Sequence, residues 1–172
     1  MSVSAGLKIA IAGAGGRMGR ALLEAVSAAP DLTLHAALEA PGHPLLGKDA
    51  GELIGSPAGV PVGADIDAIA GADVLIDFTR PEGTAAHLSA CRKHGVRMVI
   101  GTTGFSADER AEIAQAAREI AIVLAPNMSV GTNLVFKLIG AAARVLNEGY
   151  DIEIAEHMRS HIIALRDYVP DA

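Results

Sequence analysis

The amino-acid sequence predicts an α/β fold, a doubly wound parallel sheet with helices on both faces. Short apolar runs alternate with segments whose apolar residues recur at helical spacing, which is typical of consecutive βαβ units. Half of the side chains are apolar, yet only 3% are aromatic and none is Trp. Small side chains of this kind let helices pack closely on a parallel sheet. A length of 172 residues fits one domain, or one domain with the start of a second.

The expected elements follow one another in a regular order. Strands are expected at residues 7–12, 32–38, 74–78, 97–100, 120–124 and 151–155. Helices are expected at residues 17–29, 81–94, 108–118 and 130–146. Pro81 suits the first turn of its helix, and Gly95 suits the end of it. Residues 41–64 are rich in Gly and Pro, so a long loop with one short strand near 60–62 is expected there.

The charge and the apolar pattern exclude several classes of function. A net charge of −6 argues against a protein that binds nucleic acid, since such proteins are normally basic. No apolar stretch reaches the roughly 18 to 20 residues of a membrane span, and residues 1–6 lack the pattern of a signal peptide. Cys91 is the only cysteine, and its helical context favours a structural thiol over a reactive one. We therefore expect a cytoplasmic protein that binds neither nucleic acid nor membrane.

A glycine-rich turn joins the first strand to the first helix. It reads Gly13-Ala14-Gly15-Gly16-Arg17-Met18-Gly19, with the spacing G-x-x-G-x-x-G. Gly13 allows the tight turn, Gly16 lets a pyrophosphate approach the backbone, and Gly19 lets the helix lie close to the sheet. The amides and the dipole at the start of a helix attract such an anion. Glycines alone are weak evidence, because many turns need them for backbone reasons only.

Glu39 strengthens this interpretation. It stands at the end of the second strand, 39 − 19 = 20 residues after the last glycine, where a carboxylate can accept hydrogen bonds from the adenosine ribose. The alternative is an ordinary solvated loop acid. The order of strand, turn, helix and acid favours a Rossmann-type domain that binds NADH or NADPH. Ala40 and Pro41 offer no cation for a 2′-phosphate and only Arg17 could serve, which favours NADH without excluding NADPH.

Three further segments follow strands of the predicted sheet. They are Asp77 to Thr84 (DFTRPEGT), Gly101 to Phe105 (GTTGF) and Ala125 to Gly131 (APNMSVG). The carboxyl ends of parallel strands meet at one edge, where such folds bind their ligands. Taken singly, the Thr, Pro and Asn residues could be turn formers and Phe78 could be a core residue. Their convergence on one edge favours a site.

Together with the glycine turn, these segments resemble the 4-hydroxy-tetrahydrodipicolinate reductase family. The resemblance rests on GAGGRMGR, the LEA-to-LLGKDAGEL stretch, IDFTRPEGT, VIGTTGF and APNMSVGTN through to DIEIAE, over residues 8–156. It implies NAD(P)H-dependent reduction of a small cyclic unsaturated dicarboxylate to tetrahydrodipicolinate, in lysine and diaminopimelate biosynthesis. It also implies a dinucleotide-binding domain over residues 1–130. Residues 131–172 would then be a connecting helix and the truncated start of a substrate and oligomerisation domain.

The resemblance also implies which residues contact the cofactor. Those that hold the pyrophosphate would be Gly13, Ala14, Gly15, Gly16, Arg17 and Met18, and Glu39 would hold the ribose. Phe78 and Arg80 would border the cofactor. The nicotinamide side would be lined by Gly101, Thr102 and Thr103, and its carboxamide would be contacted by Ala125, Pro126, Asn127 and Met128.

The sequence departs from the family pattern after residues 151–155. The pattern there resembles E-x-H-H-x-x-K-x-D-x-P-S-G-T, in which a His and a Lys assist protonation and the Ser-Gly-Thr turn binds a substrate carboxylate. Counted from Glu156, Met158 and Ile162 stand at the His and Lys positions, and neither can supply a proton. His157 is a weak candidate, after a shift of one residue.

Three hypotheses remain open. The first is a reductase, the second a catalytically inactive NAD(P)-binding module, and the third a protein that captures reductase subunits through an unpaired strand at residues 151–155. Because most of the second domain is missing, the sequence argues against the homotetramer typical of the family. His157 and His161 are four residues apart but lack the H-E-x-x-H order, so we expect no metal and favour a polar helix or tail there.

Overall fold

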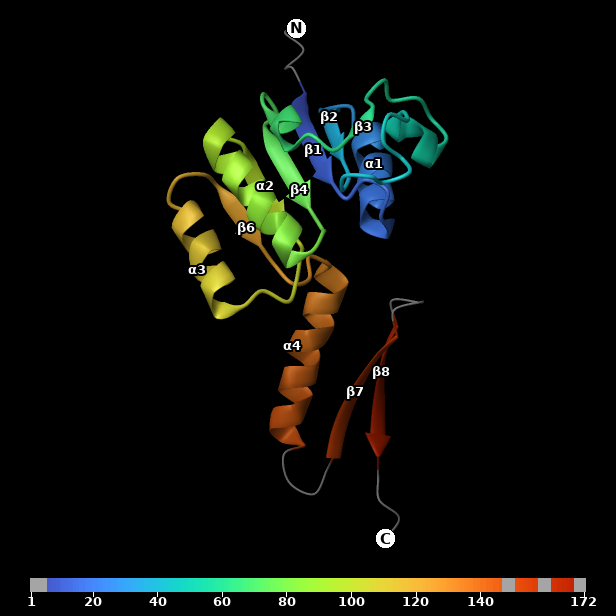
Figure 1. Cartoon of the computed structure of the whole chain (residues 1–172). Coiled ribbons are helices and arrows are strands. Elements are labelled where there is room, and N and C mark those ends of the chain that lie inside the picture. The colour runs from blue at the N-terminus through green and yellow to red at the C-terminus, as the bar shows by residue number, and fades with distance from the viewer. Residues whose placement is uncertain (1–5, 147–150, 158–161, 169–172) are drawn as a thin grey trace, which may run out of the picture. The chain divides into compact units, whose positions relative to one another are not determined.

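The computed structural model describes residues 6–146, 151–157 and 162–168 (Figure 1). The chain divides into two compact units, Met1–Pro126 and Asn127–Ala172. The first unit contains the glycine turn and Glu39, and the second contains a helix and a hairpin.

The first unit is built on a six-stranded parallel sheet with the order β3-β2-β1-β4-β5-β6. Its strands are β1 (Leu7–Ala12), β2 (Leu32–Leu38), β3 (Val62–Gly63), β4 (Val74–Asp77), β5 (Arg97–Ile100) and β6 (Ile122–Leu124). Its helices are α1 (Arg17–Ala28), α2 (Pro81–His94) and α3 (Ala107–Ala116), with two short 3-10 helices, η1 (Ala50–Ile54) and η2 (Ile66–Ile69). The doubly wound sheet predicted from the sequence is confirmed, and its strand order is that of the Rossmann fold.

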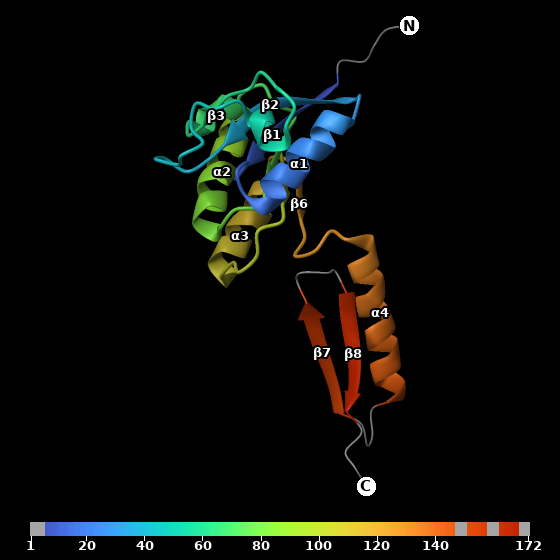
Figure 2. The same cartoon turned by 90° about the vertical axis from the view of Figure 1, so that its right-hand side faces the viewer.

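Two apolar layers lie on opposite faces of this sheet. Because side chains alternate along a strand, Ile9 and Ile11 pack on the α1 side with Leu23 of that helix. Their neighbours Ala10 and Ala12 belong to the other layer, with residues of α2 and α3. Figures 1 and 2 show α1 on one side of the sheet and α2 with α3 on the other. Helices on both faces leave the carboxyl edge of the strands as the place for a ligand.

Local signals in the sequence explain where the helices of the second layer begin and end. Pro81 occupies the first turn of α2, and Gly95 ends the helix with a φ of 68°, in the left-handed region that favours glycine. Ser106 and Glu109 form a capping box at the start of α3. Cys91 of α2 is fully buried, as expected of a structural thiol.

The segment at residues 41–64 is more ordered than the loop with one short strand that the sequence predicts. It contains η1 as well as β3. The carboxylate of Asp49 accepts hydrogen bonds from the amides of Gly51 (2.7 Å), Ala58 (2.9 Å) and Gly59 (2.6 Å). A carboxylate that accepts hydrogen bonds from three amides can order a loop that has no hydrophobic periodicity. The apolar pattern of the sequence therefore did not reveal η1.

The second unit begins with α4 (Val130–Val145), which confirms the helix expected there. Ser129 is its N-cap, and the hydroxyl accepts a hydrogen bond of 3.3 Å from the amide of Thr132. The unit continues with β7 (Asp151–His157) and β8 (Ile162–Tyr168), which pair in an antiparallel ladder.

This hairpin corrects two expectations. The strand at residues 151–155 is not unpaired, because β8 lies beside it along its whole length. His157 is the last residue of β7 and pairs with Ile162, so it does not lie in a polar helix or tail. Met158 and His161 lie outside the described residues. The apolar, β-branched run after His161 favours a strand, and the sequence interpretation overlooked it.

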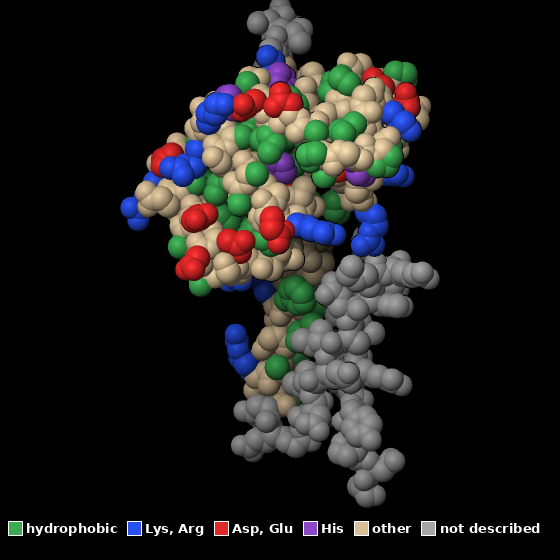
Figure 3. All heavy atoms as spheres, in the orientation of Figure 1, with side chains coloured by type: hydrophobic (Ala, Val, Ile, Leu, Met, Phe, Trp, Pro, Cys, Tyr) green, Lys and Arg blue, Asp and Glu red, His purple; other side chains and the backbone are tan. Residues whose placement is uncertain are grey.

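The face of the molecule seen in Figure 3 carries side chains of both charges, and acidic ones gather over α3. That helix has Asp108 and Glu109 in its first turn. In the described part of the chain, no helix is long and apolar enough to cross a membrane.

Candidate functional site

The glycine turn after β1 is folded tightly against the end of β2. Gly13 has a φ of +73°, and its amide donates a hydrogen bond of 2.9 Å to the carbonyl of Leu38. A Cβ at Gly19 would collide with the carbonyl oxygen of Gly13 and would lie 2.6 Å from the Cα of Ala14. Gly19 is therefore needed for α1 to lie this close to the turn.

Glu39 reaches this turn from the end of β2. Its Oε1 accepts a hydrogen bond of 2.7 Å from the amide of Gly15, and its Oε2 accepts a longer one of 3.3 Å from the amide of Ala40. A Cβ at Gly15 would lie 3.1 Å from Oε1 of Glu39 and 2.5 Å from Cδ1 of Leu45. The glycine therefore leaves room for the carboxylate to approach the backbone of the turn.

The start of α1 offers free backbone donors. Gly16 is the N-cap, no side chain caps the helix, and the first turn carries no acidic residue. Among the hydrogen bonds of the described residues, none uses the amides of Arg17, Met18 or Gly19, and Arg20 is the first to donate within the helix, to Gly16 over 3.0 Å. Three free amides and the positive end of the helix dipole can together receive an anion.

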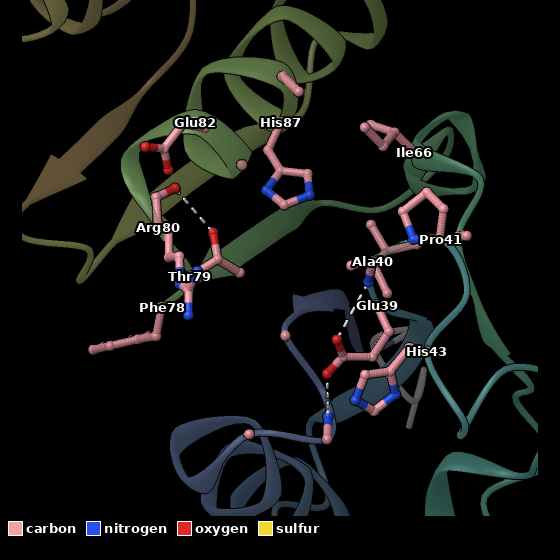
Figure 4. A pocket seen from close by; sticks show the side chains of 17 residues that line it. Glu39, Ala40, Pro41, His43, Ile66, Phe78, Thr79, Arg80, Glu82 and His87 are labelled. Atoms are coloured by element: carbon pink, nitrogen blue, oxygen red, sulfur yellow. Dashed lines mark hydrogen bonds between the residues drawn. The ribbon is translucent and has the colours of Figure 1, made fainter.

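The glycine turn and Glu39 line one cleft of about 740 Å³ within the first unit (Figure 4). The glycine turn contributes Gly13, Gly15 and Gly16. One wall follows β2 and β3 and contains Leu38, Glu39, Ala40, Pro41, His43, Ala64 and Ile66. The other wall follows β4 and contains Phe78, Thr79, Arg80, Glu82, Gly83, Ala86 and His87. The cleft thus lies where the strand order reverses at β1, the point at which such sheets bind ligands.

A buried carboxylate holds the second wall together. Asp77, the last residue of β4, accepts hydrogen bonds from Nδ1 of His87 (2.9 Å) and from the amide and hydroxyl of Thr79 (2.8 and 2.6 Å). Burial by itself would raise the pKa of Asp77, but the hydrogen bonds from His87 and Thr79 outweigh burial and lower the pKa below its ordinary value. The carboxylate is therefore ionised at neutral pH.

The end of β5 is tied to the same wall. The hydroxyl of Thr102 donates to Oδ1 of Asp77 over 3.4 Å and accepts a hydrogen bond of 3.0 Å from the hydroxyl of Thr84. A Cβ at Gly101 would collide with the ring of Phe78, so glycine is required beside that ring. The carboxyl ends of β4 and β5 are thus fixed to each other by the hydrogen bond between Thr102 and Asp77 and by the packing of Phe78 against Gly101.

The structure brings together part of the set of residues predicted to bind the cofactor. The members that line the cleft are Gly13, Gly15, Gly16, Glu39, Phe78 and Arg80. Within the turn, Ala14 is buried while Arg17 and Met18 are exposed at the start of α1. These three residues of the turn do not line the cleft, and neither do Gly101, Thr102, Thr103, Ala125 and Pro126. The last two members of the set, Asn127 and Met128, belong to the second unit.

Sequence reasoning did not single out Asp77 or His87. Asp77 could have been noticed because it ends an apolar strand and stands two residues before a Thr, a spacing that allows a local hydrogen bond. His87 lies in the second turn of α2, and nothing in the helical spacing distinguishes it from a core residue of that helix. Within the described residues, no three His, Cys, Asp or Glu side chains are grouped as a metal site would require.

Comparisons with known proteins agree on one family. Residues 7–128 match the family model described as dihydrodipicolinate reductase, N-terminus. The 4-hydroxy-tetrahydrodipicolinate reductase of Nitrosomonas europaea is 60% identical over 156 residues, which cover 90% of this chain and 58% of that protein. The protein of the same name from Dechloromonas aromatica is 59% identical over 150 residues, which cover 87% of this chain and 56% of that protein. The chain thus spans less than two thirds of the length of these relatives.

Solved structures resemble the fold of this chain. The dipicolinate-bound dihydrodipicolinate reductase from Paenisporosarcina sp. TG-14 superimposes with a TM-score of 0.66 at 28% identity, covering 90% of this chain and 62% of that chain. The WlbA dehydrogenase from Chromobacterium violaceum, with a TM-score of 0.62 at 17% identity over 88% of this chain and 44% of that chain, shares the fold alone. The family match over residues 7–128, on a Rossmann sheet with the glycine turn and Glu39 in one cleft, shows that this chain belongs to the dihydrodipicolinate reductase family.

Proposed function

We propose that the cleft binds a reduced nicotinamide adenine dinucleotide. The observation that carries this proposal is the hydrogen bond of 2.7 Å between Glu39 and the amide of Gly15, beside three free amides at the start of α1. These amides would receive the pyrophosphate, and Glu39 would accept hydrogen bonds from the adenosine ribose. A volume of about 740 Å³ is within the range of clefts that hold ligands of this size.

We further propose that NADH is preferred over NADPH. The carboxylate of Glu39 would repel a 2′-phosphate, and the residues that follow it, Ala40 and Pro41, carry no charge to offset this repulsion. Arg17 is the one cation within the glycine turn itself. A single exposed guanidinium would reduce the preference without reversing it.

The nicotinamide would supply a hydride to an unsaturated ring. In line with the names of the relatives, we propose a cyclic dicarboxylate as the substrate, reduced in lysine and diaminopimelate biosynthesis. In this protein, the carboxyl ends of β4 and β5 would border the nicotinamide, and Phe78 packs against Gly101 there. The proton that completes such a reduction would have to come from a titratable group. By residue type alone, His157 can supply a proton and Ile162, at the family's Lys position, cannot.

Binding and turnover are tested separately. Titration of NADH into the full chain, followed by nicotinamide fluorescence, measures binding, and we expect saturation at one site. Glu39→Ala should weaken binding by about tenfold or more, since a hydrogen bond to a charged group contributes about 1.5 to 3 kcal/mol. Glu24→Ala, at an exposed position of α1, is the matched control and should bind like the unchanged chain. If Glu39→Ala binds NADH as tightly as this control, the ribose contact is refuted.

A further inference from the structure

Within the described residues, His87 uses only one of its two ring nitrogens in a hydrogen bond. Its Nδ1 lies 2.9 Å from Oδ2 of Asp77, and in the described part of the chain its Nε2 forms no hydrogen bond. The residue is 9% exposed and lines the cleft on the α2 wall. In Figure 4 its ring extends from α2 into the cleft, on the side across from Ala40 and Pro41.

Asp77 determines which nitrogen of this ring carries the hydrogen. An ionised carboxylate can only accept hydrogen bonds, and the lowered pKa of Asp77 keeps it ionised at neutral pH. The Nδ1 of His87 must therefore donate to it. In the neutral ring, Nε2 is then left with a lone pair that faces the cleft. The chain thus places a fixed hydrogen-bond acceptor in this wall.

The position of His87 along the cleft indicates which part of a dinucleotide it would meet. In a Rossmann domain the pyrophosphate lies at the glycine turn and the acid after the second strand binds the adenosine ribose, so the adenine lies farther out. After Glu39, the first wall is lined by Ala40, Pro41, His43, Ala64 and Ile66, and the second turn of α2 contributes Ala86 and His87 to the other wall. Most of these side chains are apolar, as suits the faces of a flat base, and His87 is the polar residue that the second turn of α2 presents.

We propose that Nε2 of His87 accepts a hydrogen bond from the 6-amino group of adenine, so that His87 selects the base of the cofactor. This inference rests on the proposed binding of a nicotinamide adenine dinucleotide. Adenine presents a donor at position 6, whereas hypoxanthine and guanine present an oxygen acceptor there. Two acceptors facing each other would leave both without a partner. Asp77 is a positioning residue, because it fixes the tautomer and the direction of the ring.

The test compares NADH with reduced nicotinamide hypoxanthine dinucleotide, in which an oxygen replaces the 6-amino group. Titrations of the full chain, followed by nicotinamide fluorescence, give a dissociation constant for each. We expect NADH to bind about tenfold more tightly. Equal affinities would overturn the role of His87 while leaving the proposed function intact. If neither dinucleotide binds, both the proposed function and this inference are overturned.

A pair of variants separates recognition from folding. In His87→Asn the amide nitrogen can replace Nδ1 beside Asp77, but nothing replaces Nε2, so the tenfold preference should disappear through weaker binding of NADH. His94→Asn, at the C-terminal end of the same helix, is the matched control and should keep the preference. A preference that survives in His87→Asn would show that another group selects the base.

The tautomer offers a readout that needs no ligand. Nitrogen NMR of the full chain at neutral pH should show the hydrogen of His87 on Nδ1. Asp77→Asn should release this constraint and reduce the preference between the two dinucleotides. Finding the hydrogen on Nε2 in the unchanged chain would contradict the proposal, because the ring would then present a donor to the cleft.

Discussion

Oε1 of Glu39 accepts a hydrogen bond of 2.7 Å from the amide of Gly15, and this bond joins the end of β2 to the glycine turn. The other oxygen, Oε2, has only a longer contact of 3.3 Å with the amide of Ala40. One carboxylate thus orders the turn with one oxygen and leaves the second accessible to a ligand hydroxyl. The folding of the turn and the recognition of a ribose depend on the same side chain.

Glu39→Gln should change the preference between the two cofactors. Glutamine keeps an oxygen acceptor for the amide of Gly15 but has no charge to repel a 2′-phosphate. We expect the ratio of the NADPH and NADH dissociation constants to shift by about tenfold toward NADPH, equivalent to ~1.4 kcal/mol. Parallel fluorescence titrations measure it, with Glu52→Gln in η1 as the control. An unchanged ratio would show that Glu39 does not face the 2′ position.

Gly19→Ala should destabilise the first unit. Helix propensity alone would make alanine more favourable by about 1 kcal/mol, but the new methyl group would collide with the carbonyl oxygen of Gly13. Backbone atoms cannot rotate away, so we expect a loss of about 3 kcal/mol or more in the free energy of unfolding, measured by urea titration. Ala25→Gly, on the exposed side of α1, calibrates the propensity term and should cost only about 1 kcal/mol. A Gly19→Ala variant as stable as the unchanged chain would refute the close approach.

Asp77 should make the stability depend on acid pH. Its pKa is lowered in the folded chain from the ordinary value of 3.8, so the folded state binds fewer protons than the unfolded state. The stabilisation is therefore complete above about pH 4 and is lost as the pH falls through the folded-state pKa. Asp77→Asn should be less stable at about pH 5 but should lose less stability between about pH 5 and about pH 3.

Urea unfolding at the two pH values gives this difference directly. Asp49 and Glu109 also have lowered pKa values, but both remain in the variant, so the comparison isolates Asp77. Equal losses of stability in the two proteins would show that Asp77 is not held ionised by His87 and Thr79.

Cys91 should be unreactive in the folded chain. It is fully buried, and burial, assisted by the charge of Asp77, raises the pKa of its thiol to about 12. Since the thiolate is the reactive species, a disulfide reagent at mildly alkaline pH should label the native chain far more slowly than the urea-unfolded chain. Absorbance of the released thiol follows the reaction. Rapid labelling of the native chain would mean that α2 opens or that Cys91 is exposed.

The sequence predicts the fold well because its signals are local and repeat along the chain. Apolar runs, Pro81, Gly95 and the glycine turn each specify an element or its end, and the structure confirms them. The segment ordered by Asp49 and the hairpin of β7 with β8 depend on contacts or short runs that periodicity does not register. These are the places where the sequence interpretation falls short.

The candidate site is predicted less completely, for a related reason. Gly13 and Glu39 belong to a spaced pattern, so their positions in the sequence are enough to identify them. The contact between Asp77 and His87 joins the end of a strand to the second turn of a helix ten residues later, and no spacing rule points to it. Polar networks of this kind become visible only once the elements are placed in space.

Amide NMR of the chain during titration with NADH tests the central claim most directly. The signals of the amides of Arg17, Met18 and Gly19 should shift progressively and saturate, because the pyrophosphate would lie against them. The signal of the Gly15 amide should shift as well, because that amide donates to Glu39, which would hold the ribose. ADP-ribose, which lacks the nicotinamide, should shift the same amides. If the signals of these four amides do not shift when NADH is added in large excess, the glycine turn does not receive the pyrophosphate and the proposed function is wrong.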